Sequence, residues 1–235
     1  SGWTFSPATR TVSVPPDATV EDFTGYDRPP IVFVHGWAGL PPWGSCDWPD
    51  PDAAFQSVDD FLRNVGYHVE YARLETSPCY TPPLDENVPR LGNAIALAKA
   101  ATNQPKVILI AHSMGGLVSR AYMERPDYDD DVAALFTFGS PHRGVPVDLL
   151  IFLANGLSPG EYCDFQPAVC DFSEPGMTLF NQEHSERAAG VNYHVISGDA
   201  PFSPRSALGK VTYWLIGGGE GDDGIVPASS GTGLS

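Results

Sequence analysis

Basic residues are scarce in this chain of 235 residues. Thirteen Lys and Arg stand against 29 Asp and Glu, which gives a formal net charge of −16 at pH 7. A surface of that charge repels phosphate backbones and anionic lipid, so we expect no nucleic-acid partner. The sequence also lacks internal repeats and any apolar run near the roughly 20 residues that cross a bilayer. Its length and composition therefore predict one globular domain over residues 1–235.

Cysteine is sparse, and the chain carries no initiator methionine. The four cysteines have neither CxxC spacing nor clustered histidines, which argues against zinc and favours two disulfides. Three pairings are open, and we favour Cys46 with Cys79 and Cys163 with Cys170; the alternative is four reduced thiols. The chain begins at Ser1 without a basic and apolar leader. The cysteines favour a secreted protein, and we then expect that its signal peptide has already been removed.

Short apolar runs alternate with helical patterns along the sequence, which is typical of a parallel sheet covered by helices. The runs that predict strands are residues 31–34, 67–74, 107–110, 132–138 and 191–197, with a further candidate at 211–216. The patterns that predict helices are residues 55–66, 84–103 and 115–124. Within the second of these helices we expect Pro89 in the first turn, where a missing N–H is tolerated. The predicted fold class is α/β, with a mostly parallel sheet flanked by helices.

About fifty residues separate the predicted strands that end at Phe138 and begin at Val191, too many for a single crossover helix. They predict an insertion. Inside it, residues 145–157 are apolar around one acid, Asp148, and are more apolar than a surface helix should be. This segment is either a lid or part of the core. We assign residues 145–190 to an inserted lid region.

Ser113 lies between a predicted buried strand and the helix that follows it directly, in the sequence A-H-S-M-G-G at residues 111–116. A strand that reverses into a helix within one sharp turn requires small residues two positions before and after the central residue, here Ala111 and Gly115. Such a turn exposes the serine at the carboxyl edge of the sheet and aims a helix N-terminus at developing negative charge. The alternative is an ordinary turn serine, but the flanking elements favour a nucleophile.

A second loop follows the first strong strand and reads His35-Gly36-Trp37. Enzymes that transfer acyl groups place half of an oxyanion hole at such a position, and main-chain N–H groups supply it. We therefore expect the N–H groups of Trp37 and Met114 to converge on one oxygen, each contributing about 3 kcal/mol in the transition state. His35 itself is expected to pack and to hydrogen-bond the loop.

Four motifs together resemble the α/β-hydrolase fold and, within it, the secreted bacterial lipases. They are V-H-G-W at residues 34–37, A-H-S-M-G-G at 111–116, G-S-P-H-R-G at 139–144 and G-D-D-G-I-V-P at 221–227. The resemblance implies Ser113 as nucleophile, Trp37 and Met114 as oxyanion donors, and Asp223 as the acid of a catalytic triad. Asp199, which directly follows a predicted strand, is the competing acid.

The chain departs from that pattern because no histidine follows Asp223. Proteins of this fold run serine, acid and histidine in chain order, and a serine without its base is a weak nucleophile. His194 is the least implausible substitute among the six histidines. Lipases of this kind place the histidine roughly twenty residues beyond the acid, so we expect it to lie in a C-terminal portion beyond Ser235.

The leading hypothesis is a serine lipase or esterase that hydrolyses hydrophobic, acylglycerol-like esters through an acyl-enzyme, with a lipid–water interface as a further partner. The alternatives are an inactive binding domain of the same fold, and a polyester depolymerase or thioesterase on the same scaffold. No cofactor is required and no metal ligand is assigned. The resemblance allows a structural calcium, although the acidic clusters lack EF-hand spacing. The sequence does not determine the oligomeric state.

Overall fold

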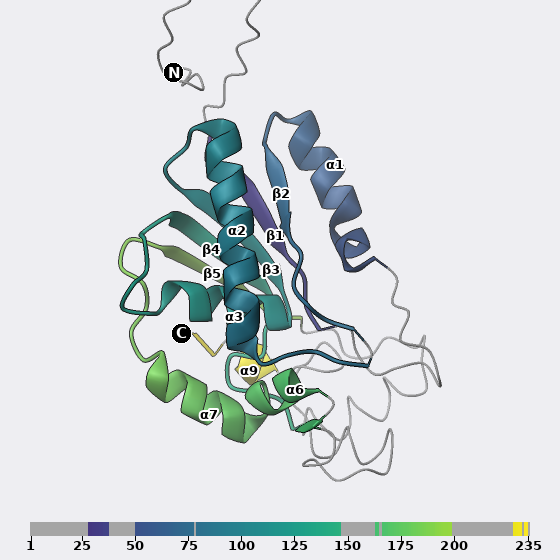
Figure 1. Cartoon of the computed structure of the whole chain (residues 1–235), viewed down its shortest axis with the longest axis vertical. Helices are drawn as coiled ribbons and strands as arrows, with labels where there is room; N and C mark the ends of the chain where they lie inside the picture. The colour runs from purple at the N-terminus through teal and green to yellow at the C-terminus, as the bar shows by residue number, and fades with distance from the viewer. Residues whose placement is uncertain are drawn as a thin grey trace, which may run out of the picture.

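The computed structural model describes residues 28–37, 50–77, 79–146, 163–164, 166–198, 228–231 and 233–234. Its centre is a parallel five-stranded sheet in the order β2-β1-β3-β4-β5 (Figure 1). The strands are β1 (Ile31–Val34), β2 (Val69–Ala72), β3 (Val107–His112), β4 (Val132–Phe138) and β5 (Asn192–Ile196). These strands confirm the predicted α/β class. The candidate strand at 211–216 lies outside the described residues.

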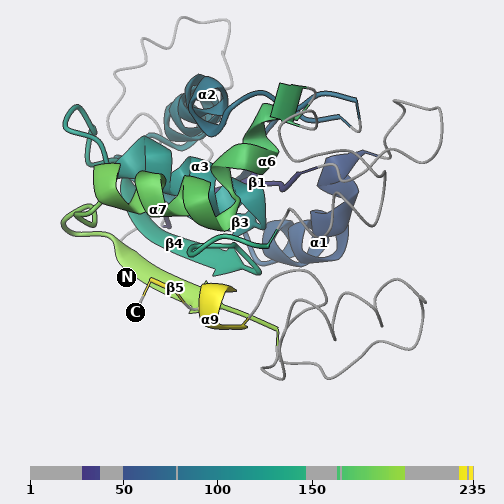
Figure 2. The ribbon, with the colours of Figure 1, turned by 90° about the horizontal axis from the view of Figure 1, so that it is seen from below.

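Helices cover both faces of the sheet, as the two views together make plain (Figures 1 and 2). The longer elements are α1 (Gln56–Asn64), α2 (Leu84–Thr102), α3 (Met114–Met123) and α7 (Glu174–Glu183). The shorter ones are the 3-10 helix η1 (Pro51–Phe55), α6 (Pro167–Asp171) and α9 (Ala228–Gly231). Helices α2 and α3 lie on one face of the sheet and α1 on the other.

The alternation of side chains along β1 explains this division of the core. Val32 and Val34 point into the main cluster, which includes Ile95 of α2 and Leu117 of α3. The intervening Phe33 points to the other face, where it stacks on a ring of η1 with 4.5 Å between centroids. Because successive strand residues face opposite sides, one short apolar strand anchors both helical layers.

Helix α2 begins five residues before Pro89, so the expectation of Pro89 in its first turn was wrong. The helix begins at Leu84, whose N–H donates to the Asp171 carboxylate at 2.8 Å. This tertiary partner satisfies one of the N–H groups that a helix start leaves without an acceptor. Local sequence favoured a later start because proline is best tolerated in the first turn.

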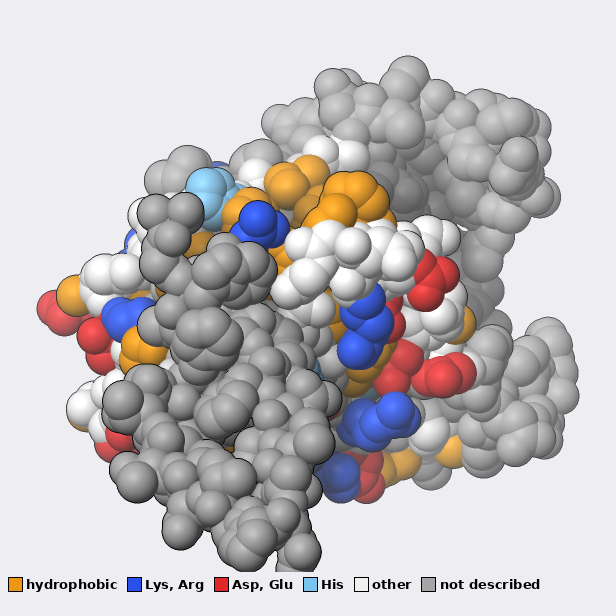
Figure 3. Space-filling view, turned by 90° about the horizontal axis from the view of Figure 1, so that it is seen from above, with side chains coloured by type: hydrophobic (Ala, Val, Ile, Leu, Met, Phe, Trp, Pro, Cys, Tyr) orange, Lys and Arg blue, Asp and Glu red, His pale blue; other side chains and the backbone are white. Residues whose placement is uncertain are grey.

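The amino ends of the strands carry paired charges. Lys99 and Lys106 contact Asp131 and Asp130 at 3.0 and 2.6 Å. Figure 3 views the molecule from that end and shows basic and acidic side chains close together on the described surface. Within the described ranges, no helix has the length and apolar character that crossing a bilayer requires.

Candidate active site

Ser113 occupies the single position between the end of β3 and the start of α3, with φ 53° and ψ −127°. A positive φ is uncommon for a residue other than glycine and costs roughly 1–3 kcal/mol. Main-chain hydrogen bonds hold it there. The Ser113 N–H donates to Phe138 O at 2.9 Å, and the Gly116 N–H donates to Ser113 O at 3.1 Å. Backbone strain that is maintained at one half-buried hydroxyl points to a functional role.

Two glycines bring the loop after β1 against this corner. A Cβ built on Gly36 would lie 2.7 Å from the Ser113 Cβ and 3.0 Å from His112 O. A Cβ on Gly115 would collide with the carbonyl oxygens of Val34 and His35. The close approach of the loop after β1 to the Ser113 corner therefore requires glycine at both positions. It also places Trp37 directly after Gly36, whose backbone contacts the serine.

The main-chain N–H groups of Trp37 and Met114 lack protein acceptors among the hydrogen bonds of the described residues. For Met114 this follows from helix geometry, because the first N–H groups of α3 have no intrahelical partner. Both residues are well covered, since Met114 is buried and Trp37 is half-buried. Donors without a protein partner beside a strained serine are what an oxyanion site requires.

The two candidate acids, Asp223 and Asp199, lie outside the described residues. The six histidines lie within them, and each of the six contacts other groups. The partners are Gly36 and Leu74 for His35, Glu70 for His68, Thr137 for His142, Glu124 for His184 and Phe136 for His194. His112 ends β3 next to Ser113; it is exposed and also interacts with another group. Among the described hydrogen bonds, none joins an imidazole to the Ser113 hydroxyl.

His194 is poorly placed to replace the missing base. Its ring stacks on Phe136 with 4.3 Å between centroids, and the two residues are register partners on β5 and β4. On β4, Phe136 lies two residues before Phe138, and the Phe138 carbonyl accepts a hydrogen bond from the Ser113 N–H. Strand β4 pairs with β3, which ends next to Ser113, whereas His194 lies one strand farther away on β5. The sheet thus separates His194 from the corner along the strands and across them.

His142 lies in the turn after β4 and is fully buried. Burial lowers the pKa of this imidazole to about 3, and the nearby Arg120 and Arg187 cations act in the same direction. One ring nitrogen contacts Thr137 Oγ1 at 3.1 Å, and the other has no hydrogen-bond partner among the described groups. The ring is therefore neutral and structural at ordinary pH, which agrees with its sequence interpretation as part of a turn motif.

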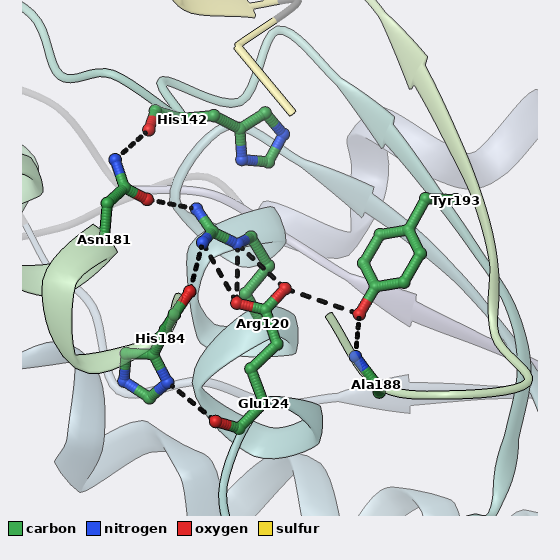
Figure 4. A network of polar contacts seen from close by, with 7 residues as sticks. All are labelled: Arg120, Glu124, His142, Asn181, His184, Ala188 and Tyr193. Carbon is green, nitrogen blue, oxygen red and sulfur yellow. Dashed lines mark hydrogen bonds and ion pairs between the residues drawn. The ribbon is translucent and has the colours of Figure 1, made fainter. Parts of the chain in front are cut away.

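A buried ion pair joins α3 to α7 and to the turn after β4 (Figure 4). The Arg120 side chain is 4% exposed and that of Glu124 is 0% exposed; the guanidinium contacts both carboxylate oxygens at 3.0–3.1 Å. Arg120 also donates to Asn181 Oδ1 at 2.9 Å, and Asn181 Nδ2 donates to the His142 carbonyl at 2.9 Å. Burial raises the pKa of Glu124 even though Arg120 lowers it. Sequence reasoning missed this pair, although an Arg and a Glu four residues apart in an apolar helix was a usable signal.

The inserted region is described from Cys163, except for residue 165. A disulfide joins Cys163 and Cys170 with 5.8 Å between Cα atoms, which confirms that pairing. Cys79 is also disulfide-bonded, and its expected partner Cys46 lies outside the described residues. Of the apolar segment 145–157, which we interpreted as lid or core, residues 147–157 are likewise outside them, and Val145 is buried in the main core cluster. The described part of the insertion packs against the loop that leads into α2.

The described residues contain no group of three or more His, Cys, Asp or Glu side chains arranged to hold a metal ion. The acidic clusters considered for calcium are Asp47, Asp50 and Asp52, the run Asp129–Asp131, and Glu220 with Asp222. Several of these acids have other partners. Asp131 contacts Lys99 and Tyr122, and Asp52 contacts Arg73 at 3.4 Å. Glu220 and Asp222 lie outside the described part, so calcium binding stays a prediction.

The sheet order, the strand-to-helix corner and the likeness to solved structures define the class: the chain has the α/β-hydrolase fold. A lipase of Bacillus licheniformis in its mature form superposes with a TM-score of 0.61 over 86% of this chain and 78% of its own, at 24% identity. A metagenomic carboxyl esterase gives a TM-score of 0.56 over 86% and 59% of the two chains, at 19% identity. The fold expectation is confirmed.

Sequence relatives agree with this class. Residues 76–155 match the family model described as a PGAP1-like alpha/beta domain. A curated triacylglycerol lipase of Burkholderia plantarii is 31% identical over 136 residues, which amount to 57% of this chain and 35% of the lipase. The chain thus spans about a third of the length of the curated lipase that it matches.

Proposed function

We propose that this chain hydrolyses carboxylic esters through an acyl-enzyme formed on Ser113. The observation that carries the proposal is the strained Ser113 corner in contact with Gly36, beside two main-chain N–H groups that have no acceptor among the described residues. The similarity to a triacylglycerol lipase and the esterase-like fold support ester chemistry in particular.

In the proposed reaction the Ser113 oxygen attacks the ester carbonyl carbon, and a base takes the hydroxyl proton. The N–H groups of Trp37 and Met114 donate to the oxyanion of the tetrahedral intermediate, whose collapse releases the alcohol. Water then attacks the acyl-enzyme and regenerates the serine. Asp223 orients the base, with Asp199 as the competing acid.

We propose further that the base is a histidine supplied by chain beyond Ser235, because each of the six histidines makes other contacts. Ser230 and Gly231 support this idea, since they pack at the carboxyl edge of the sheet. The Ser230 hydroxyl donates to Gly144 O at 2.6 Å, and Gly231 contacts Ser197 at the end of β5. A native protein whose intact mass ends at Ser235 and which retains full esterase activity would refute this part of the proposal.

The proposed substrates are esters with hydrophobic acyl chains. The apolar segment 145–157 and the curated lipase relative favour them over small polar esters, and both make a lipid–water interface a reasonable partner. Secretion is supported by the Cys163–Cys170 disulfide, because disulfides persist in oxidising compartments.

The test is a Ser113→Ala variant assayed with p-nitrophenyl butyrate and decanoate. We expect its turnover to fall by roughly 10⁴-fold or more, because removing a catalytic nucleophile leaves only binding and oxyanion effects. Ser57→Ala, at an exposed position on α1, is the matched control and should retain full activity.

Labelling with a fluorophosphonate distinguishes an enzyme from a binding domain of the same fold. Rapid labelling of the wild type, and none of Ser113→Ala, supports an activated serine. An unlabelled wild type without ester turnover would favour the inactive binding domain instead. Faster turnover of thioesters or polyester films than of simple esters would reassign the substrate class.

A further inference from the structure

Trp37 contacts the inserted region through its indole. The Nε1–H donates to Gln166 Oε1 at 3.2 Å, across 129 residues of sequence. The indole also packs at an angle on Phe172, with 5.5 Å between ring centroids. One hydrogen bond and one ring contact therefore fix the side chain of a residue whose preceding glycine touches Ser113.

Gln166 is itself held on the other side. It is 1% exposed, and its Nε2 donates to Ser77 O at 3.1 Å in the loop before α2. Both ends of this buried amide are thus used, one toward Trp37 and one toward a main-chain carbonyl. A buried amide with both ends bonded has little freedom to rotate, so it can fix the position of its partner.

The segment that carries Gln166 is anchored at several points. Gln166 directly precedes α6, and the Cys163–Cys170 disulfide closes a short loop around it. The Ala168 N–H donates to Thr81 O at 3.3 Å, and Asp171 accepts from the Leu84 N–H at 2.8 Å. The insertion is therefore fastened to the loop before α2 and to the first residue of that helix.

We propose that Gln166 is a positioning residue that fixes the indole of Trp37 and, through it, the direction of the Trp37 main-chain N–H. The inference rests on the proposed function, because it takes that N–H as an oxyanion donor. An oxyanion donor acts mainly on the tetrahedral transition state, so misplacing it lowers kcat and leaves KM largely unchanged.

The kinetic experiment compares Gln166→Met with Asn87→Leu. Methionine keeps the length of the side chain and removes both hydrogen bonds. Asn87 is the matched control, since it is also a fully buried amide that braces the same loop, through Glu75, without touching Trp37. Both variants should lower the thermal midpoint. Only Gln166→Met should lower kcat, by about tenfold, at unchanged KM.

A double-mutant cycle tests whether the effect passes through the indole. Trp37→Phe keeps the main-chain N–H and a ring against Phe172 but removes the Nε1–H donor. If Gln166 acts through Trp37, the double variant should lose no more kcat than either single variant. Multiplicative losses, or a Gln166→Met variant with unchanged kcat, would overturn the proposal.

A spectroscopic readout separates this inference from the proposed function. With ¹⁵N-labelled tryptophan, the five tryptophans give separate main-chain and indole signals, and Trp37→Phe identifies those of Trp37. Gln166→Met should shift both Trp37 signals, whereas Asn87→Leu should leave them in place. An unmoved Trp37 main-chain signal refutes the positioning role whatever the kinetics. Shifted signals in a protein that hydrolyses no ester refute the oxyanion role and the proposed function together.

Discussion

The contact between Gly36 and Ser113 is possible only because residue 36 has no Cβ atom. Two chain segments 77 residues apart approach until a single carbon on Gly36 would fall 2.7 Å from the serine Cβ. Neither the serine Cβ nor the His112 carbonyl can move cheaply, because main-chain hydrogen bonds fix the corner. The geometry proposed for acyl transfer therefore depends on a glycine that carries no chemistry of its own.

Gly36→Ala should lower ester turnover at least tenfold and destabilise the fold by about 1–3 kcal/mol, as overpacking does in cores. The added methyl group pushes the 35–37 loop away from Ser113 and separates the two proposed donors. Gly92→Ala is the control. Gly92 lies within α2, and its new Cβ would lie 3.3 Å from a Tyr122 ring carbon. Steady-state kinetics and urea unfolding check both variants, and an active Gly36→Ala enzyme would contradict the argument.

At the residue scale, the sharp turn at Ser113 could be predicted from the sequence, whereas the role of Gln166 could not. Ser113 stands between a β-branched apolar run and a helical pattern, with small residues at fixed offsets, so the requirement is local and visible. Gln166 belongs to no local sequence motif. Its partners Trp37 and Ser77 are remote in sequence, so no local pattern indicates these contacts. A single buried amide acquires its role from the neighbours that the fold supplies.

At the scale of elements, α3 connects the serine corner to the insertion. Its first residue follows Ser113, and near its other end Arg120 donates to Asn181 Oδ1 and to the His184 carbonyl at the end of α7 (Figure 4). The main-chain carbonyl of Glu124, which caps α3, contacts the His184 ring at 3.2 Å. The Tyr193 hydroxyl of β5 donates to the Glu124 carboxylate at 3.3 Å. One buried charge pair thus ties a helix, the insertion and the last described strand together.

Glu124→Gln should lower the free energy of unfolding by about 3 kcal/mol, because it leaves the buried Arg120 cation without a counter-charge. Lys106→Gln is the matched control. It breaks a partly exposed ion pair with Asp130 and should cost less than about 1 kcal/mol. Urea denaturation measures both, and equal losses in the two variants would show that burial of the Arg120 pair has no special weight.

Strand and helix positions were largely predictable because burial on both faces gives β1 and β3 uninterrupted apolar runs. The error at Pro89 has a tertiary cause, since α2 begins at Leu84 with Asp171 as a distant acceptor. The exposed apolar side chains of Val58 in α1 and of Val65, which caps that helix, show a related limit. Periodicity indicated a helix there but did not specify which apolar residues face the sheet.

For the molecule as a whole, buried ionisable groups set the response to acid. Burial lowers the pKa of both His35 and His142, so the unfolded chain binds protons before the folded one as the pH falls. These imidazoles therefore make the fold less stable toward acid. Burial raises the pKa of Asp52, Glu124 and Asp171, and such carboxyls act in the opposite direction.

The contribution of His142 is separable by substitution. Between pH 6.5 and about 3 only the unfolded chain binds its proton, so stability should fall with pH by up to about 1.4 kcal/mol per unit. His142→Gln should therefore show a shallower loss of stability from pH 7 to 4.5 in urea unfolding. Thr137→Val, which removes the hydrogen-bond partner but keeps the imidazole, should retain the wild-type slope. An unchanged slope in His142→Gln would contradict the assignment.

The sequence by itself determined the alternation of strands and helices, the sharp turn at Ser113 and one disulfide, because each depends on residues close together along the chain. Tertiary structure alone decided that Gly36 touches Ser113, that Gln166 holds Trp37, and that Arg120 is buried against α7. Those contacts join residues dozens of positions apart. Their energies come from burial and exclusion of water, which no local pattern encodes.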